Sequence, residues 1–255
     1  MSSNDSVGKI IGVAFALCIV CSVIVSAAAV MLKPAQEANK DLDRKRNILA
    51  AAGMLEEGRS VDELFERIEP RYVDLRSGEF TDAVPAGYDQ RAASKDPALS
   101  ESLAGEDIAK IGRRANFAEV YLVKGESSDY EKIILPVHGY GLWSTLYGFL
   151  ALESDGNTVA GLGFYDHGET PGLGGEVDNP RWKALWSGKK VYRDGEVELG
   201  LVKGSVDPSA SDADWKVDGL SGATLTSRGV SNLISFWLGD NGFAPFLENL
   251  RKGEV

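Results

Sequence analysis

The chain has 255 residues and a formal net charge of −11, with 27 Lys and Arg against 38 Asp and Glu. Because an acidic surface repels phosphate backbones, the composition argues against a nucleic-acid partner. Both cysteines, Cys18 and Cys21, fall in an apolar N-terminal stretch, which leaves the rest of the chain without a disulfide or a thiolate metal site. We interpret this Cys-x-x-Cys pair as small apolar side chains in preference to a redox or metal motif.

The first predicted element is a membrane-spanning helix at residues 10–32. These positions carry no charged side chain, and at about 1.5 Å per residue they cross the ~30 Å hydrocarbon layer of a bilayer. A cleaved signal peptide is the alternative, although its apolar core usually extends over only about 7–15 residues. We therefore predict a retained anchor that follows a short N-terminal tail, residues 1–9.

The charges that flank this helix bear on its orientation. Only Asp5 and Lys9 precede it, whereas Lys33, Lys40 and residues 44–46 follow it as basic positions. Because cytoplasmic flanks are enriched in Lys and Arg, charge alone favours a large domain in the cytoplasm.

Residues 33–115 are predicted to form a membrane-proximal, mainly helical region. A polar helix continues from the anchor, and a second one begins with a capping box in which Ser60 accepts from free amides while Glu63 reaches back. Pro70 marks the expected end of that helix. The mixed, polar remainder contains one short expected helix near 106–113.

From residue 116 the pattern indicates strands. The stretch 117–125, "FAEVYLVKG", alternates, and "KIILPVHGYG" is a short apolar run that ends in glycine. Two hairpins are predicted, with turns at 154–157 and at Asp194-Gly195. A short helix is expected in "NPRWKALW" between them.

A C-terminal helix closes the predicted domain, residues 116–255. In "GVSNLISFWLGDNG", Val230, Leu233, Ile234 and Trp237 recur on one helical face. The predicted fold class is α+β: one transmembrane helix, then a soluble domain with membrane-proximal helices and a largely antiparallel sheet.

Familiar enzyme motifs are incomplete in this sequence. "GYGLWS" has Ser144 where a dinucleotide fingerprint needs its third glycine, and "GLSGA" has Ala223 where a nucleophile elbow has glycine. No P-loop is present. An anchored serine hydrolase around Ser221 is therefore unsupported by the motifs, although they do not exclude it.

Three glycine-rich turns remain, at residues 138–143, 167–175 and 218–227. Glycine lets the backbone approach a ligand closely or adopt positive φ. Beside these turns, Tyr140 and Trp143 can stack on a flat ring, while Glu169 and Thr170 can hydrogen-bond its polar edge. Each turn alone is ordinary, but the three together favour a site for a planar ligand.

The last turn precedes a predicted helix that starts near residues 226–229. A helix start offers free amides and a positive dipole, which favour a phosphate. Thr224 lies just before this start, and Arg228 can add a charge-assisted bond.

The stretch "DGLSGATLTS", residues 218–227, resembles the flavinylation motif of the FMN-binding domain family. In that family the threonine of Ser-Gly-Ala-Thr carries FMN through a phosphoester bond, and the matching residue here is Thr224. "HGETPGLG" and "GYGLW" are similar to other motifs of the family. The resemblance implies that a separate flavin transferase, using FAD and magnesium, attaches FMN to Thr224, with Asp218 as the acid of its target motif.

The resemblance further implies an electron-transfer subunit of a respiratory, sodium-pumping NADH:quinone oxidoreductase. Its partners would be the other subunits of that complex and membrane lipid, and its location a bacterial inner membrane. It would be single-pass, with a cytoplasmic tail (residues 1–9) and the large domain periplasmic, against the charge rule. The expected flavin contacts, besides Thr224, are Tyr140, Leu142, Trp143, Glu169, Thr170, Leu173, Ser221, Gly222, Ala223 and Thr226.

Two further alternatives stay open at this point. The G subunit of the related Rnf electron-transport complex has the same motifs. A membrane-anchored, non-redox binding module could use the same turns for a sugar or a peptide.

Overall fold

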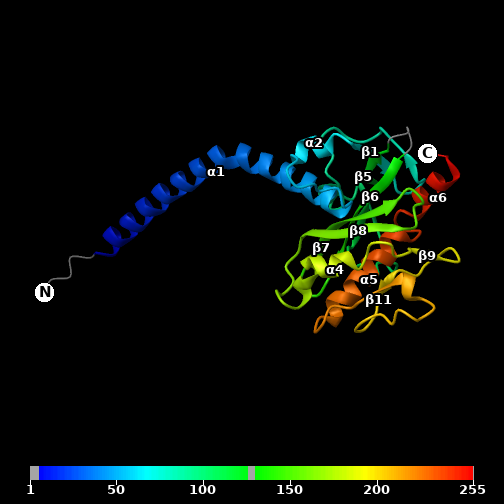
Figure 1. Cartoon of the computed structure of the whole chain (residues 1–255). Helices are drawn as coiled ribbons and strands as arrows, with labels where there is room; N and C mark the ends of the chain where they lie inside the picture. The colour runs from blue at the N-terminus through cyan, green and yellow to red at the C-terminus, as the bar shows by residue number, and fades with distance from the viewer. Residues whose placement is uncertain (1–5, 126–129, 255) are drawn as a thin grey trace. The chain divides into compact units, whose positions relative to one another are not determined.

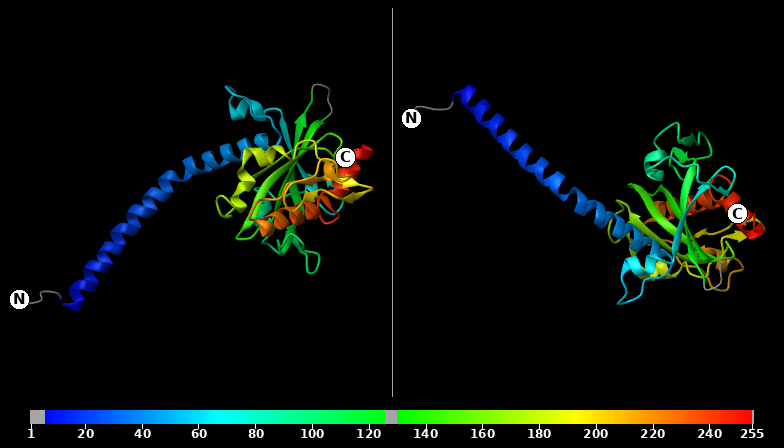
Figure 2. Two further views of the ribbon diagram at one scale, coloured as in Figure 1. Left: turned by 60° about the horizontal axis from the view of Figure 1, so that its bottom comes forward. Right: turned by 90° about the horizontal axis from the view of Figure 1, so that it is seen from above.

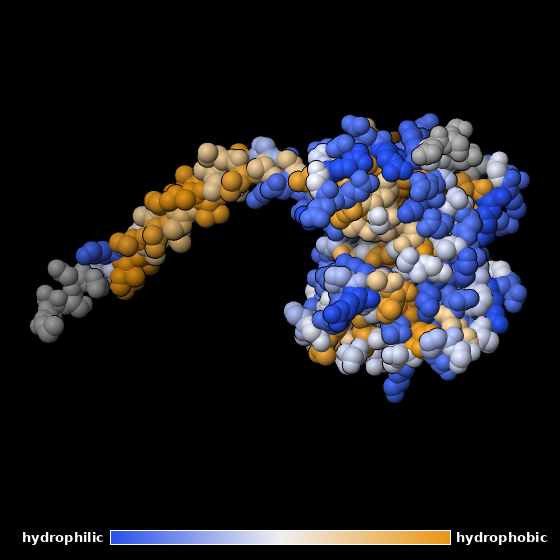
Figure 3. Space-filling view, viewed as in Figure 1, coloured by the Kyte–Doolittle hydropathy of each residue, from blue (hydrophilic) through white to orange (hydrophobic). Residues whose placement is uncertain are grey.

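A computed structural model describes residues 6–125 and 130–254, in two compact units, Met1–Arg44 and Lys45–Val255. Helix α1 (Val7–Ala51) begins in the first unit and ends in the second. Its N-terminal part is exposed, long enough and apolar enough to cross a membrane, and it is visible as the apolar stretch of Figure 3. The predicted tail, residues 1–9, lies mostly outside the described residues.

A six-stranded antiparallel sheet forms the centre of the second unit (Figure 1). Its order is β2 (Glu79–Phe80), β1 (Ile68–Asp74), β5 (Phe117–Lys124), β6 (Tyr130–Tyr140), β7 (Thr145–Glu153) and β8 (Val159–Asp166). The β6–β7 pair is the longest, in register from Lys132↔Glu153 to Tyr140↔Thr145.

Both faces of this sheet are buried, which explains why its central strands are nearly continuous apolar runs. On one face Tyr121, Ile134 and Phe149 pack against the last turns of α1, including Leu49. Strand neighbours such as Leu135 point to the opposite face. That second face is covered by α5 (Thr224–Leu238) and α6 (Ala244–Lys252), as Figures 1 and 2 show.

The remaining elements are short. They are α2 (Val61–Phe65), α3 (Gln90–Ala93), β3 (Ser100–Ser102), β4 (Arg113–Ala115), η1 (Gly174–Asp178), α4 (Pro180–Ala184), β9 (Tyr192–Arg193), β10 (Glu196–Val197), β11 (Gly200–Leu201), η2 (Ala213–Trp215) and β12 (Lys216–Val217). They surround the sheet and hold the connections that build the site.

Several predicted elements are confirmed, and with them the α+β class. Strands β7 and β8 form the first hairpin, and β9 and β10 form the second around Asp194, whose φ is +52°. The expected short helix is α4. The four apolar positions assigned to one face of α5, Val230, Leu233, Ile234 and Trp237, are fully buried.

The mainly helical character predicted for residues 33–115 is wrong from residue 68 onward, where the chain forms the four strands β1 to β4. Pro70 lies inside β1 and does not follow a helix. It is tolerated there because β2 pairs only with Val73 and Asp74, so that β1 is an edge strand at Pro70. Residues from Lys45 onward form one compact unit, so the structure does not divide this chain at residue 116.

The short helix expected near 106–113 is also wrong. The Asp107 carboxylate accepts from the N–H groups of Ile111 at 2.9 Å and Gly112 at 2.7 Å. Lys110 and Gly112 have φ of +54° and +75°, which a helix cannot accommodate. An aspartate that binds nearby backbone amides stabilises a turn in place of a helix.

Candidate functional site

The three glycine-rich turns meet where β6 and β8 end and α5 begins. Gly229 of α5 lies so close to the end of β6 that a Cβ there would be 2.5 Å from the Tyr140 carbonyl oxygen. A Cβ on Gly222 would be 3.0 Å from Leu173 Cδ2, in the turn that follows β8. The glycines thus permit close approach, and segments far apart in sequence share one edge of the domain.

The loop that leads into α5 is fixed by its own polar contacts. Trp182 Nε1 donates to the Asp218 carbonyl oxygen at 2.9 Å, and the Val206 N–H donates to Asp218 Oδ1 at 2.8 Å. The Leu220 N–H donates to Ser227 Oγ at 2.9 Å. Gly222, with φ of +70°, then turns the chain into the helix.

Thr224 is the first residue of α5 and its side chain is exposed. The preceding residue, Ala223, has no side-chain oxygen to cap the helix. Amide N–H groups in the first turn of a helix therefore face the space beside Thr224, together with the positive end of the helix dipole. This is a suitable position for a phosphate, on a helix of 15 residues.

A buried carboxylate, Glu169, joins the three segments. Its Oε1 accepts from the N–H groups of Leu142 at 3.0 Å, Trp143 at 2.9 Å and Ser144 at 3.4 Å. Its Oε2 accepts from Thr226 Oγ1 at 2.6 Å. A single side chain thus links the turn after β6 to the first turn of α5.

The electrostatics of Glu169 follow from these contacts. Burial alone would raise the pKa of this carboxyl, but hydrogen bonds from the Thr226 hydroxyl and the backbone N–H groups outweigh it and hold the pKa below its ordinary value. Glu169 is therefore an ionised acceptor at neutral pH.

The expected ligand contacts separate into two groups. Tyr140, Trp143, Thr170, Leu173, Ser221 and Gly222 are exposed and Leu142 is partly buried, whereas Glu169, Ala223 and Thr226 are buried. The sequence predicts that Glu169 hydrogen-bonds the edge of a ligand, and this stays a prediction. In the structure its oxygens accept from four protein donors, so that Glu169 and Thr226 form the frame of the site.

Sequence reasoning missed two residues here. Ser144 Oγ accepts from the Gly168 N–H at 2.5 Å and so joins two of the turns. Leu225, next to Thr224 in the chain, is 51% exposed, and we call the exposed side chains of Tyr140, Trp143, Leu173 and Leu225 the apolar rim. The position of Leu225, directly after the threonine of the Ser-Gly-Ala-Thr motif, was a signal in the sequence, whereas the partner of Ser144 was not.

The side chains of both histidines contact residues other than Ser221. His138 lies between Tyr147, with ring centroids 5.4 Å apart, and Trp237, at 4.9 Å. His167 Nε2 is 2.9 Å from Asp178 Oδ2, and its Nδ1 accepts from the Glu169 N–H at 3.2 Å. A serine hydrolase built on Ser221 gains no support from this arrangement.

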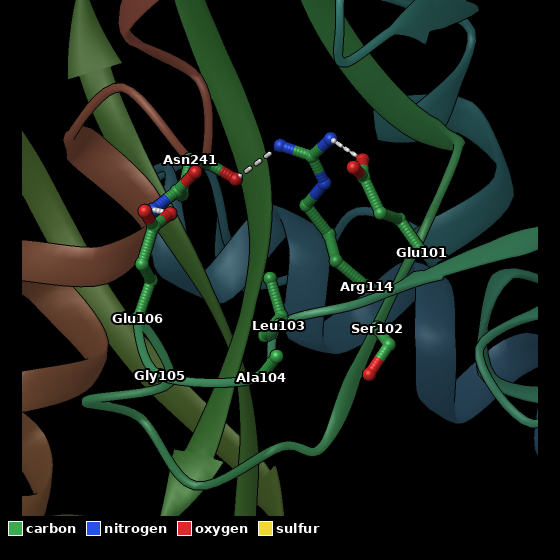
Figure 4. A pocket seen from close by; sticks show the side chains of 8 residues that line it. All are labelled: Glu101, Ser102, Leu103, Ala104, Gly105, Glu106, Arg114 and Asn241. Carbon is green, nitrogen blue, oxygen red and sulfur yellow. Dashed lines mark hydrogen bonds and ion pairs between the residues drawn. The ribbon is translucent and has the colours of Figure 1, made fainter.

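A cavity of about 350 Å³ lies elsewhere in the domain, between the β3–β4 connection and the turn that joins α5 to α6 (Figure 4). Its lining residues are Glu101, Ser102, Leu103, Ala104, Gly105, Glu106, Arg114 and Asn241. Arg114 donates to the Asn241 carbonyl oxygen at 2.6 Å and to Glu101 at 3.1 Å. Because these groups bind one another, this cavity is not the candidate site.

The glycine-rich turns and the helix start define an FMN-binding domain, the family that the sequence matches over residues 141–239. The matched segment begins at the turn after β6 and ends just after α5. It thus includes Trp143, Glu169 and Thr224.

Comparison with known proteins narrows the class. The C subunit of the Na(+)-translocating NADH-quinone reductase from Pseudomonas aeruginosa is 58% identical over 262 aligned residues, with 100% of both chains covered. The corresponding protein from Vibrio vulnificus is 54% identical, with 99% of each chain covered. The crystal structure of Shewanella oneidensis NqrC superposes with a TM-score of 0.77 at 38% identity, covering 84% of this chain and 99% of that one. The chain belongs to the family of Na(+)-translocating NADH-quinone reductase C subunits, which confirms the resemblance seen in its motifs and decides against the G subunit of the Rnf complex.

Proposed function

We propose that this chain carries FMN covalently on Thr224 and relays electrons within a membrane-bound, sodium-translocating NADH-quinone reductase. The observation that carries the proposal is the exposed Thr224 hydroxyl at the start of a long helix, beside an exposed apolar rim. Tyr140, Trp143 and Leu173 are 40%, 66% and 44% exposed, so their side chains are accessible to a flat apolar ring.

The attachment is a transfer from FAD, made by a separate flavin transferase with magnesium. Thr224 Oγ1 bonds to the phosphorus of the FMN half while the pyrophosphate bond to AMP breaks. The hydroxyl proton is released, and AMP is the leaving group. No electrons are exchanged in this step, and Thr224 is an attachment point without an acid–base role.

The chain's residues would bind the flavin in two parts. The α5 start would hold the phosphate through backbone N–H groups, and Trp143, Tyr140 and Leu173 would cover the ring. Bound FMN supplies one-electron chemistry at the edge of the domain, while the protein sets its potential through ring contacts. NADH oxidation, quinone reduction and sodium passage would occur with the partner subunits.

The attachment is tested by Thr224→Ala in the full-length chain produced together with the transferase. Because the hydroxyl is exposed, its loss is expected to change folding stability by no more than about 0.5 kcal/mol. After denaturation, the wild-type chain should retain flavin fluorescence and Thr224→Ala should be dark. Ser221→Ala removes another exposed hydroxyl of the same loop, and as the matched control it should keep its flavin.

A flavin-bearing peptide that maps to another residue in Thr224→Ala would contradict the attachment. A purified wild-type chain without covalent colour would favour the non-redox binding module.

For the location, we propose a bacterial inner membrane, with residues 10–32 spanning the lipid and the large domain on the periplasmic side. Charge alone favours the opposite orientation, and we expect assembly with partner subunits to override it. A reporter active only outside the cytoplasm, fused after Val255, should give a signal. An active cytoplasmic reporter and a silent exported one would favour the charge rule.

A further inference from the structure

Four hydroxyl side chains lie within seven residues of the attachment loop, and they are chemically similar acceptors. The structure treats them differently. Ser221 and Thr224 are exposed, whereas Thr226 is 0% and Ser227 8% exposed. Something in the fold therefore decides which hydroxyl a modifying enzyme can reach.

The two buried hydroxyls are held by specific bonds. Ser227 Oγ donates to the Ala223 carbonyl oxygen at 3.0 Å and accepts from the Leu220 N–H at 2.9 Å, both within its own loop. Thr226 Oγ1 instead donates to Glu169 Oε2 at 2.6 Å, and Glu169 lies 57 positions earlier in the chain. The orientation of the first turn of α5 thus depends on a distant carboxylate.

The direction in which Thr224 faces follows from helix geometry. With 3.6 residues per turn, side chains two positions apart point about 200° away from each other around the axis. When Thr226 is bound inward to Glu169, Thr224 is turned outward. The Thr226 bond thus buries one threonine and presents the other.

The other carboxylate oxygen of Glu169, Oε1, binds the turn that carries Trp143, a residue of the apolar rim. Oε1 accepts from the N–H groups of Leu142 and Trp143 at 3.0 and 2.9 Å. The fit is tight, because a Cβ on Gly141 or on Gly174 would lie 2.6 Å from a Glu169 oxygen. The carboxylate therefore fixes the turn that carries Trp143 relative to the helix that carries Thr224.

We propose that Glu169 is a positioning residue that selects Thr224 as the flavin acceptor and holds Trp143 on the same rim. This inference rests on the proposed attachment of FMN to Thr224. Glu169 acts through Thr226 and through the N–H groups of residues 142–144, without touching the flavin.

The chemistry of the side chain predicts a graded series of variants. Glutamine keeps one oxygen for the backbone N–H groups, and its NH₂ can donate to a Thr226 hydroxyl that rotates to accept. Alanine removes every acceptor. Thr226→Val keeps the shape of Thr226 and removes only its hydroxyl. Partial rescue by glutamine distinguishes positioning from a requirement for negative charge.

The test has two readouts on the full-length chain in detergent. Hydrogen–deuterium exchange of the flavin-free chain reports on the hydrogen bonds that Glu169 makes to Thr226 and to the N–H groups of residues 142–144, which we call the brace. Peptides covering 141–146 and 224–230 should exchange faster together in Glu169→Ala, and less so in Glu169→Gln. In Thr226→Val the change should concentrate in 224–230. The matched control is Glu176→Gln, an acid in the neighbouring η1 turn, which should exchange as wild type.

The second readout is the rate and position of flavin attachment with the transferase and FAD. Since a misplaced reacting group commonly slows a reaction by about tenfold to a hundredfold, we expect a loss of that size at Thr224 in Glu169→Ala. Part of the flavin should move to Thr226, detected by peptide mass spectrometry. Glu169→Gln should be intermediate.

Attachment to Thr224 at the wild-type rate in both Glu169→Gln and Thr226→Val, with unchanged exchange, would overturn the inference. Faster exchange in the Glu169 and Thr226 variants, without any effect on the rate or the position of attachment, would also overturn it. If the wild-type chain never carries flavin on Thr224, the proposed function fails, and acceptor selection by Glu169 fails with it. Exchange that is altered only in the Glu169 and Thr226 variants would then report a brace without this role, so the two failures remain distinguishable.

Discussion

Two regions of this domain bury a charged side chain, and they differ in how fully its hydrogen-bonding atoms are satisfied. Glu169 at the candidate site accepts four protein hydrogen bonds, and its pKa is lowered, so the ionised form is favoured. Arg114 beside the cavity of Figure 4 has two bonded nitrogens, but its buried Nε has no partner among the described residues. Burial lowers the pKa of this guanidinium, so its charge is disfavoured there. A buried charge thus stabilises a structure only where the surrounding donors or acceptors are complete.

The comparison predicts its largest effect at Glu169. Glu169→Ala leaves three backbone N–H groups and one hydroxyl without their acceptor, and each unsatisfied buried group costs about 1–3 kcal/mol. Water entering from the exposed rim should relieve part of this loss, so we expect destabilisation by about 3 kcal/mol. Urea unfolding of the flavin-free chain at pH 7.5 measures it. A loss below about 1 kcal/mol would show that the four bonds do not act together.

A third ionisable group, His138, is partly buried, and desolvation between aromatic rings is the main reason that its pKa is lowered to about 4. In the unfolded chain the pKa of His138 has its ordinary value of 6.5. As the pH falls, the unfolded chain therefore binds a proton at His138 before the folded chain does, and acid favours unfolding. The stability is complete above pH 6.5 and declines as the pH falls toward 4. Between pH 7.5 and 5 the expected loss is about 2 kcal/mol.

The matched control for that prediction is His138→Phe, which keeps a ring between Tyr147 and Trp237 but cannot titrate. Its stability should change less over the same range, measured by urea unfolding at both pH values. Glu169 does not interfere, since its pKa lies below the ordinary value of 4.5 and its contribution is lost only below this window. An equal pH response in both proteins would assign the effect to other groups.

The smallest effect is expected at Arg114. Arg114→Met removes the unsatisfied Nε and returns Glu101, whose side chain is 59% exposed, to water. The remaining penalty is one carbonyl oxygen, that of Asn241. Replacing an imperfect buried ion pair with an apolar side chain is often neutral, so we expect a change within about 1 kcal/mol. A loss as large as that of Glu169→Ala would remove the distinction between the two regions.

The sequence supported those features that depend on near neighbours. The hairpin turn at Asp194-Gly195 and the buried face of α5 were predictable, because turn chemistry and helical periodicity are local. The proposal of Thr224 as the flavin acceptor likewise rests on a motif that surrounds it directly. Strand β1 was missed because Pro70 lies within it, and proline normally argues against a strand.

The frame of the site, Glu169 and Thr226, could not be predicted, because it depends on a contact between residues far apart in the sequence. The bond between Thr226 and Glu169 joins residues 57 positions apart, and no pattern in either stretch names the other. An acid in a glycine-rich turn is as consistent with ligand binding as with internal bracing. The internal bracing is visible only in the tertiary contacts, where four protein donors bind the carboxylate, and the proposed positioning role of Glu169 rests on them.

The end of α1 bears on how a water-soluble fragment of this protein should be cut. Ile48, Leu49 and Ala51 are at most 2% exposed, and Lys132 Nζ donates to the Ala52 carbonyl oxygen at 3.0 Å. Gly161 has no room for a Cβ because the Ala51 carbonyl oxygen occupies that position. A fragment that starts after Ala52 would uncover the apolar surface of Tyr121 and Phe149 and is expected to aggregate, whereas one that starts ahead of Lys45 keeps this surface covered.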